Sequence, residues 1–185
     1  MRKVTALLVG CLLVVSSAQA GRVDHVAVGH DKGVYQVAVS SWIALPQAEL
    51  VELLTDYEKV SAANEAIKEV TILPSPAEGV TRLAATLEVC VWFYCKKLKQ
   101  VQDMTLVSAG FLEAKMLPEQ SDYKFGEASW HMIAEHEGTR LMFNVAVEPD
   151  FWVPPLIGPV VIKRKMREEA VETVEGIEAL AQHDG

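Results

Sequence analysis

The stretch that decides the fold is YKFGEASWHMIAEHEGTRLMFNVAVE, residues 123–148. Polar and apolar residues alternate along both of its halves. This alternation is typical of half-buried β-strands, because successive side chains point to opposite faces of a sheet. Glu135-His136-Glu137-Gly138 lies between the halves, and this short polar segment favours a turn. We therefore predict two adjacent antiparallel strands at residues 123–134 and 140–148.

The same pattern continues towards the N-terminus. Strand-like runs are separated by short turn-forming segments, and they cover residues 67–73, 80–91, 96–107 and 111–117. Short connections between successive strands imply antiparallel neighbours, so these runs and the two strands above form a meander. A further strand at 34–43 is expected to pair with a short extended segment at 23–28, across a turn at Gly29–Gly33. Two short helices follow, beginning near Pro46 and ending near Ala63.

A long amphipathic helix is predicted at about residues 159–182. Apolar residues recur there every three or four positions and give the helix one buried face; they are Met166, Ala170, Val174, Ile177 and Ala181. Gly176 lies within this helix, although a glycine costs about 1 kcal/mol in a helix interior. Its small size is explained either by room for a ligand or by close packing of the helix on the sheet.

The order of these elements resembles the START-like, helix-grip superfamily, whose members include polyketide cyclases/dehydratases and coenzyme-Q-binding proteins. The resemblance covers about residues 34–181, and its carriers are Ala44-Leu45-Pro46, Leu54-Thr55-Asp56-Tyr57, Gly126 with Trp130, and Gly138-Thr139-Arg140. It implies an α+β fold in which a curved antiparallel sheet with two short helices wraps around the long C-terminal helix. It also implies a cavity for an apolar ligand. It does not specify a function, because the superfamily includes binding proteins, carriers and enzymes.

The first twenty residues have the pattern of a secretory signal peptide. Arg2 and Lys3 precede an uncharged run at 4–15, and an A-x-A-like site ends at Ala20. The run is too short for a transmembrane helix. A lipoprotein site with Cys11 as the lipidated residue is the alternative, but cleavage there would leave half of the apolar run on the mature protein. We therefore expect cleavage after Ala20 and export, to the periplasm.

Removal of residues 1–20 would leave 165 of the 185 residues and change the net charge from −8 to −10. We expect an N-terminal extension at 21–33, which could add a strand, and a START-like domain at 34–183. A chain in which half of the residues are hydrophobic is not intrinsically disordered. The acidic balance argues against nucleic acid as a partner, because that affinity comes from neutralised phosphates.

Cys90 and Cys95 are the cysteines that remain after cleavage. Outside the cytoplasm, a nearby pair favours a structural disulfide. Zinc binding is the alternative, but two cysteines without two close partner ligands make a poor site. The sequence also contains no HExxH spacing and no nucleotide-binding fingerprint, so we expect neither a metal nor another cofactor.

Two aromatic segments are predicted at the same end of the sheet, because the turns of a meander alternate between its two ends. One is Trp92-Phe93-Tyr94 and the other is residues 151–157, which begin with Phe151 and Trp152. Cations follow both segments, and aromatic residues beside cations suit a membrane interface. One hypothesis is therefore a cavity mouth that makes peripheral membrane contact and admits a lipid-like ligand. Alternatively, the segments pack on each other and close this end, or they bind a protein partner.

Acid–base chemistry is a second hypothesis. Alternation groups Glu127, Ser129 and His131 on one face of the strand at 123–134, and it puts Glu88 and Asp103 on similar faces of earlier strands. If this polar face looked into the cavity, His131, Glu88 and Asp103 could act as general acids and bases in a cyclase or dehydratase. The simpler alternative is that the polar face meets solvent.

We expect, as the main hypothesis, an exported protein that binds or carries a hydrophobic small molecule or a lipid. The expected contact residues are the aromatic segments and the inner face of the final helix: Trp92, Phe93, Tyr94, Trp130, Phe151, Trp152, Met166, Ala170 and Val174. A cyclase-like enzyme and a protein-interaction module without ligand remain the alternatives.

Overall fold

The computed structural model describes residues 22–91, 94–153 and 158–184. Its described strands form one antiparallel sheet in the order β1-β2-β8-β7-β6-β5-β4-β3. The strands are β1 (Arg22–Asp31), β2 (Val34–Ile43), β3 (Ile67–Leu73), β4 (Val80–Val91), β5 (Tyr94–Ser108), β6 (Phe111–Met116), β7 (Tyr123–Glu135) and β8 (Gly138–Pro149). The helices are α1 (Gln47–Thr55), α2 (Tyr57–Ser61), the short 3₁₀ helix η1 (Pro118–Gln120) and α3 (Gly158–Asp184).

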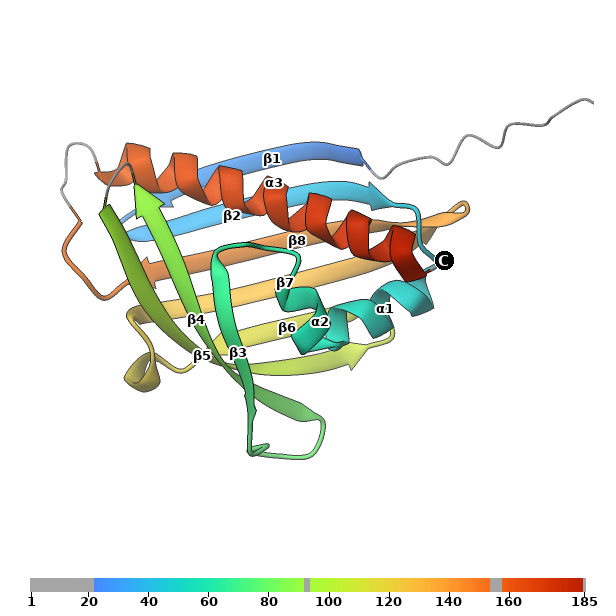
Figure 1. The fold of residues 1–185 in the computed structure, drawn as a ribbon, viewed down its shortest axis with the longest axis horizontal. Helices are drawn as coiled ribbons and strands as arrows, with labels where there is room; N and C mark the ends of the chain where they lie inside the picture. The colour runs from blue at the N-terminus through green and yellow to red at the C-terminus, as the bar shows by residue number, and fades with distance from the viewer. Residues whose placement is uncertain (1–21, 92–93, 154–157, 185) are drawn as a thin grey trace, which may run out of the picture.

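The sheet is strongly curved, and α3 lies along its concave side (Figure 1). At one end of the sheet, α1 and α2 connect β2 to β3, and β3, β4 and β5 curl round the side opposite β1. This arrangement is the helix-grip architecture that the sequence predicted, and the meander from β3 to β8 is confirmed strand by strand.

The N-terminal hairpin differs from the sequence-based expectation. The expected pairing with the strand at 34–43 is present, but the first strand, β1, has ten residues rather than the six expected at 23–28, and it pairs with β2 along its whole length. The turn contains only Lys32 and Gly33, whose φ angles are 47° and 90°. Two positive φ angles characterise the tightest hairpin turns. Gly29 and His30, expected in the turn, therefore remain in the strand.

The core lies between α3 and the inner face of the sheet. Ala170, Val174, Ile177 and Ala181 of α3 are buried there, which confirms the predicted apolar face. Met166, the fifth predicted residue, is partly buried against the same core.

Gly176 is required by close packing. A Cβ built at this position would lie 2.1 Å from the carbonyl oxygen of Ala63 and 2.6 Å from its Cα. The close-packing explanation is therefore correct, but the partner is the segment after α2 and not the sheet. The next residue, Asn64, is 7% exposed and donates from Nδ2 to Thr173 Oγ1 at 2.7 Å and to the Glu169 carbonyl at 3.2 Å. These contacts fix α3 against the end of α2.

Within the described ranges, no helix combines the length and the apolar character needed to cross a membrane.

Candidate functional site

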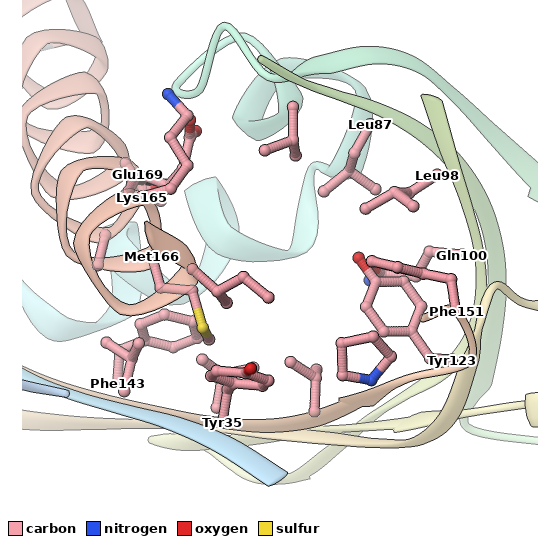
Figure 2. Close-up of a pocket in the computed structure, with 18 residues that line it drawn as sticks. Tyr35, Leu87, Leu98, Gln100, Tyr123, Phe143, Phe151, Lys165, Met166 and Glu169 are labelled. Atoms are coloured by element: carbon pink, nitrogen blue, oxygen red, sulfur yellow. Dashed lines mark hydrogen bonds and ion pairs between the residues drawn. The ribbon is translucent and has the colours of Figure 1, made fainter. Parts of the chain in front are cut away.

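A cavity lies between the inner face of the sheet and α3. It has a larger chamber of about 290 Å³ and a smaller one of about 160 Å³. Leu87, Gln100 and Thr173 line both chambers, so the chambers are neighbours. Figure 2 shows the larger chamber, with Met166 projecting from α3 towards Phe143 and Tyr35 on the sheet. Pockets of this kind are the usual place for small-molecule binding.

Strand alternation explains why the cavity wall is mainly apolar. On β4 and β8 every second side chain faces inward, including Leu87, Val89, Phe143, Val145 and Val147 of the larger chamber. The smaller chamber continues this wall with Leu83 and Ala85 of β4, Met104 of β5 and Leu112 of β6, and it is closed by Leu54, Tyr57, Val60, Trp130 and Ile177. The cavity therefore offers an apolar surface over most of its length.

Two tyrosines add hydroxyl groups to the larger chamber. Burial raises the pKa of Tyr123 to about 12, and the nearby Asp122 carboxylate acts in the same direction. Burial also raises the pKa of Tyr35 above its ordinary value. Both phenols are therefore neutral at physiological pH, and neither adds a negative charge to the apolar wall.

A half-buried ion pair completes the helical wall of the larger chamber. Lys165 Nζ lies 2.5 Å from Glu169 Oε1, and the two side chains are only 28% and 19% exposed. The hydrogen bond to Glu169 raises the pKa of Lys165, and burial opposes this shift. The second carboxylate oxygen, Glu169 Oε2, is buried and has no hydrogen-bond partner among the described residues. This is the most polar point on a wall that is otherwise mainly apolar.

A residue that follows the first predicted aromatic segment contacts the first residue of the second segment. Lys96 Nζ, at the start of β5, lies 4.1 Å from the centre of the Phe151 ring, which follows β8. Phe151 lines the larger chamber, whereas Trp152 is 79% exposed. Trp92, Phe93 and residues 154–157 lie outside the described residues, as does the side chain of Tyr94. Lys96 and Phe151 therefore lie together beside the larger chamber, and the position of the two whole segments stays a prediction.

The other predicted contact residues have mixed positions. Met166 and Ala170 line the larger chamber, and Trp130 lines the smaller one. The Trp130 ring stacks on Phe143 with centroids 5.1 Å apart, which joins the walls of the two chambers. Val174 is 2% exposed and belongs to the packed core rather than to the cavity lining.

The three acid–base candidates lie on the sheet face opposite the cavity. Each alternates with an inward-facing neighbour: His131 with Trp130, Glu88 with Leu87, and Asp103 with Gln102. The idea that they meet inside the cavity is therefore wrong, and the simpler alternative of an outward polar face describes them. His131 stacks on the Phe111 ring at 4.2 Å. Asp103 accepts two hydrogen bonds from Arg82, at 2.6 and 2.8 Å, and these hold the pKa of its carboxyl below the ordinary value.

Cys90 and Cys95 form the predicted disulfide. They are directly opposite each other on β4 and β5, so the bond ties the strands together near the end where the aromatic segments lie. No group of His, Cys, Asp and Glu within the described ranges has a metal-binding arrangement.

Several cavity residues were not expected from the sequence, namely Tyr35, Gln100, Tyr123, Lys165, Glu169 and Thr173. For the last three a signal did exist. They recur at intervals of four residues in α3 and run directly alongside the predicted apolar positions 166, 170 and 174. A helix row next to a buried row is half-buried, so these polar residues could have been predicted at the cavity edge.

No protein-family model matches this sequence, and no curated protein matches it either. Among solved structures, a START superfamily protein from Mycobacterium smegmatis matches with a TM-score of 0.66 and 17% identity, covering 81% of this chain and 99% of that one. The ZhuI aromatase/cyclase from Streptomyces sp. R1128 matches with a TM-score of 0.65 and 13% identity, covering 80% and 94%.

A STAR-related lipid transfer protein from Xanthomonas axonopodis matches with a TM-score of 0.63 and 8% identity, covering 86% of this chain and 99% of that fragment. At identities this low, the structural similarity establishes the fold and leaves the activity open. The chain has the α+β helix-grip fold of the START-like superfamily.

Proposed function

We propose that this protein binds or carries an apolar small molecule or lipid in the cavity between the sheet and α3. The observation that carries the proposal is the pair of neighbouring chambers, whose walls consist mainly of inward-facing aliphatic and aromatic side chains. Such walls stabilise a ligand by removing its apolar surface from water, at about 25 cal/mol per Å². The similar folds of a START superfamily protein and a STAR-related lipid transfer protein support the same function.

Binding is favoured over catalysis by the position of the acid–base candidates. His131, Glu88 and Asp103 face away from the cavity, because the residues beside them in each strand line it. A cyclase or dehydratase needs a general acid or base within hydrogen-bond reach of its substrate. The ZhuI aromatase/cyclase is similar in fold, and that similarity alone does not assign its reaction to this chain.

The first experiment is direct binding of the neutral fluorescent probe N-phenyl-1-naphthylamine. Ala170→Phe fills the larger chamber from α3, and Val147→Phe fills it from β8. Both variants should bind the probe at least tenfold more weakly than the wild type. Ala179→Phe is the matched control, because Ala179 lies on the exposed side of the same helix. Unchanged probe affinity in both cavity variants, with their folding verified by circular dichroism, would contradict the proposal.

A second experiment uses a series of n-alkanols of increasing length to displace the probe. Each buried CH₂ contributes about 0.8 kcal/mol, which corresponds to about a fourfold gain in affinity per carbon. The gain should stop once the two chambers are full. Extraction of the protein purified from its native host, followed by mass spectrometry, then identifies the natural ligand.

We also propose that the protein is exported and acts outside the cytoplasm, as the residues at 1–20 indicate. Mass spectrometry of the mature protein from its native host tests this directly. Cleavage after Ala20 gives a chain that begins with Gly21, whereas a lipidated Cys11 at the N-terminus would replace this proposal with a lipoprotein anchor.

The mouth of the larger chamber is proposed to contact an anionic bilayer. Trp152 is 79% exposed beside Phe151, and cations from two elements, Lys96 and Lys163, lie close in sequence to these aromatic residues. Each cation near an anionic surface contributes about 1 kcal/mol. Co-sedimentation with vesicles containing phosphatidylglycerol should decrease for Trp152→Ser and for Lys96→Ser. Equal co-sedimentation of wild type and both variants would refute membrane contact without affecting the cavity proposal.

A further inference from the structure

The Lys165–Glu169 pair is the charged part of the larger chamber's lining, and a purely apolar ligand makes no hydrogen bond to it. Figure 2 shows the two side chains next to each other on α3, at the edge of the chamber. Lys165 Nζ has three donors, and Glu169 Oε1 accepts from it at 2.5 Å. Glu169 Oε2 is buried without a partner among the described residues. Buried carboxylate oxygens are almost always hydrogen-bonded in native proteins.

Gln100 and Thr173, two other polar side chains of the cavity, make hydrogen bonds within the protein. Gln100 Nε2 donates to Gln102 Oε1 at 2.6 Å. Thr173 Oγ1 accepts from Asn64 Nδ2 and donates to the Glu169 carbonyl, both at 2.7 Å. A ligand would have to break these bonds to use the same groups. Glu169 Oε2 makes no such bond, but it has almost no exposed surface, so the carboxylate has to turn towards the chamber for a ligand to reach it.

We infer that Lys165 and Glu169 bind the head group of an amphipathic ligand, and that this head group is a neutral hydroxyl, either an alcohol or a phenol. The inference rests on the proposed function, because it assumes an apolar ligand in the cavity. A hydroxyl donates its proton to Glu169 Oε2 and accepts from the Lys165 ammonium through its oxygen. It is the simplest group that satisfies both partners at once.

Charged head groups are less suitable because the pair is already balanced. A carboxylate would lie close to the Glu169 carboxylate, and an ammonium would lie close to Lys165, so each would meet a like charge in a partly buried place. An ether or an ester accepts from Lys165 but cannot donate, and it therefore leaves Glu169 Oε2 unpaired. Hydrogen bonds to a charged group discriminate strongly against analogues that lack the donor.

The position of the pair also orients the ligand. Lys165 and Glu169 lie on the same helix row as Thr173, two turns and one turn before it respectively, and Thr173 borders both chambers. A head group at the pair therefore leaves the apolar chain to run along the larger chamber towards Trp130 and Leu112 of the smaller one.

Matched twelve-carbon probes test the inference. Dodecanol, dodecyl methyl ether, dodecanoate and dodecylamine compete with N-phenyl-1-naphthylamine for the wild-type protein. Dodecanol should bind about 10- to 100-fold more tightly than the ether, since it makes one more hydrogen bond to a charged group. Equal binding of dodecanol and the ether would overturn the inference, and so would tighter binding of dodecanoate or dodecylamine than of dodecanol.

Variants of the pair provide the second part of the test. Lys165→Met with Glu169→Leu removes both charges and keeps the wall apolar, so it should bind N-phenyl-1-naphthylamine normally and lose the preference for dodecanol. Glu169→Gln alone should reduce this preference if the double variant does not fold. Glu175→Leu, on the exposed side of the same helix, is the matched control and should keep the preference. A preference that persists in the double variant would show that another group binds the hydroxyl.

The two proposals fail in different ways. If N-phenyl-1-naphthylamine and all four twelve-carbon probes fail to bind the wild-type protein, the proposed function is wrong, and the inference fails with it. If the apolar probe binds and the head groups are not distinguished, only the inference is wrong.

Discussion

Replacing Gly176 by alanine should destabilise the protein, although alanine is the better helix former. In an unconstrained helix interior, Gly→Ala is worth about 1 kcal/mol of added stability. Here the new Cβ would lie 2.1 Å from the Ala63 carbonyl oxygen and 2.6 Å from the Ala63 Cα. These are backbone atoms, so no side-chain rotation relieves the contact. The segment around Ala63 has to move.

That movement carries two costs. Overpacking a closely packed contact costs typically 1–3 kcal/mol. A shift of the same segment also disturbs the hydrogen bonds of Asn64 to Thr173 and to the Glu169 carbonyl, and a net hydrogen bond contributes about 0.5–1.5 kcal/mol. After subtraction of the gain in helix propensity, we expect a net loss of about 1–5 kcal/mol. For a domain of this size the loss corresponds to a decrease in Tm of roughly 2–20 °C.

Urea unfolding followed by circular dichroism measures the change. Glu175→Ala is the neighbouring control on the exposed side of α3, and its free energy of unfolding should stay within about 0.5 kcal/mol of the wild type. Ala63→Gly should not rescue Gly176→Ala, because the contacted atoms of Ala63 all belong to its backbone. If Gly176→Ala is as stable as the wild type, or more stable, then the packing explanation of this glycine is wrong.

Three further outcomes follow from the structure. Changing Cys90 and Cys95 to serine should lower the free energy of unfolding by about 2 kcal/mol, because the disulfide closes only a short loop. Urea unfolding of the variant that matches that of the oxidised wild type would contradict this. Absorbance titration should show one tyrosine that ionises near pH 12 and disappears in Tyr123→Phe. The folded pKa of Tyr123 is raised above the unfolded value, so Tyr123 contributes about 3 kcal/mol to the free energy of unfolding below pH 10. This contribution is lost as the pH rises to 12. The free energy of unfolding of Tyr123→Phe should therefore decrease less over the same pH range. Asn64→Ala should lower the free energy of unfolding by about 1–3 kcal/mol, since it leaves buried groups unpaired. A loss of stability smaller than that of the exposed control Glu65→Ala would refute this role of Asn64.

The strands could be predicted from the sequence because alternation is a local property. Residues 123–148 have a period of two on both sides of a turn, and the structure places β7 and β8 there, with β7 one residue and β8 three residues longer than expected. The turn after β1 was predicted too early in the sequence, because Gly29 was interpreted as the first residue of the turn. In the structure Gly29 pairs with Gln36 in the hairpin, and the turn uses Lys32 and Gly33 instead.

The inner face of the sheet could not be predicted in the same way. Alternation shows that Gln100 and Gln102 share a face of β5, and that Lys99 and Asp103 share the other, but both faces contain polar residues. Which face is covered depends on the curvature of the sheet and on where α3 lies, and neither is a local property. For this reason the acid–base candidates were considered for the cavity, while Gln100 was not.

Thr173 links the cavity to the stability of the segment after α2. Its side chain borders both chambers, and its hydroxyl holds Asn64, whose Oδ1 in turn accepts from the Ala66 amide at 2.7 Å. Local opening of this segment would therefore expose the wall that separates the chambers, and a ligand packed against Thr173 opposes that opening. At one hundred times its Kd, a ligand that binds only the closed state contributes about 2.7 kcal/mol. Hydrogen exchange at the Ala66 amide should accordingly slow about a hundredfold on saturation, so a single backbone amide outside the cavity reports whether the cavity is occupied.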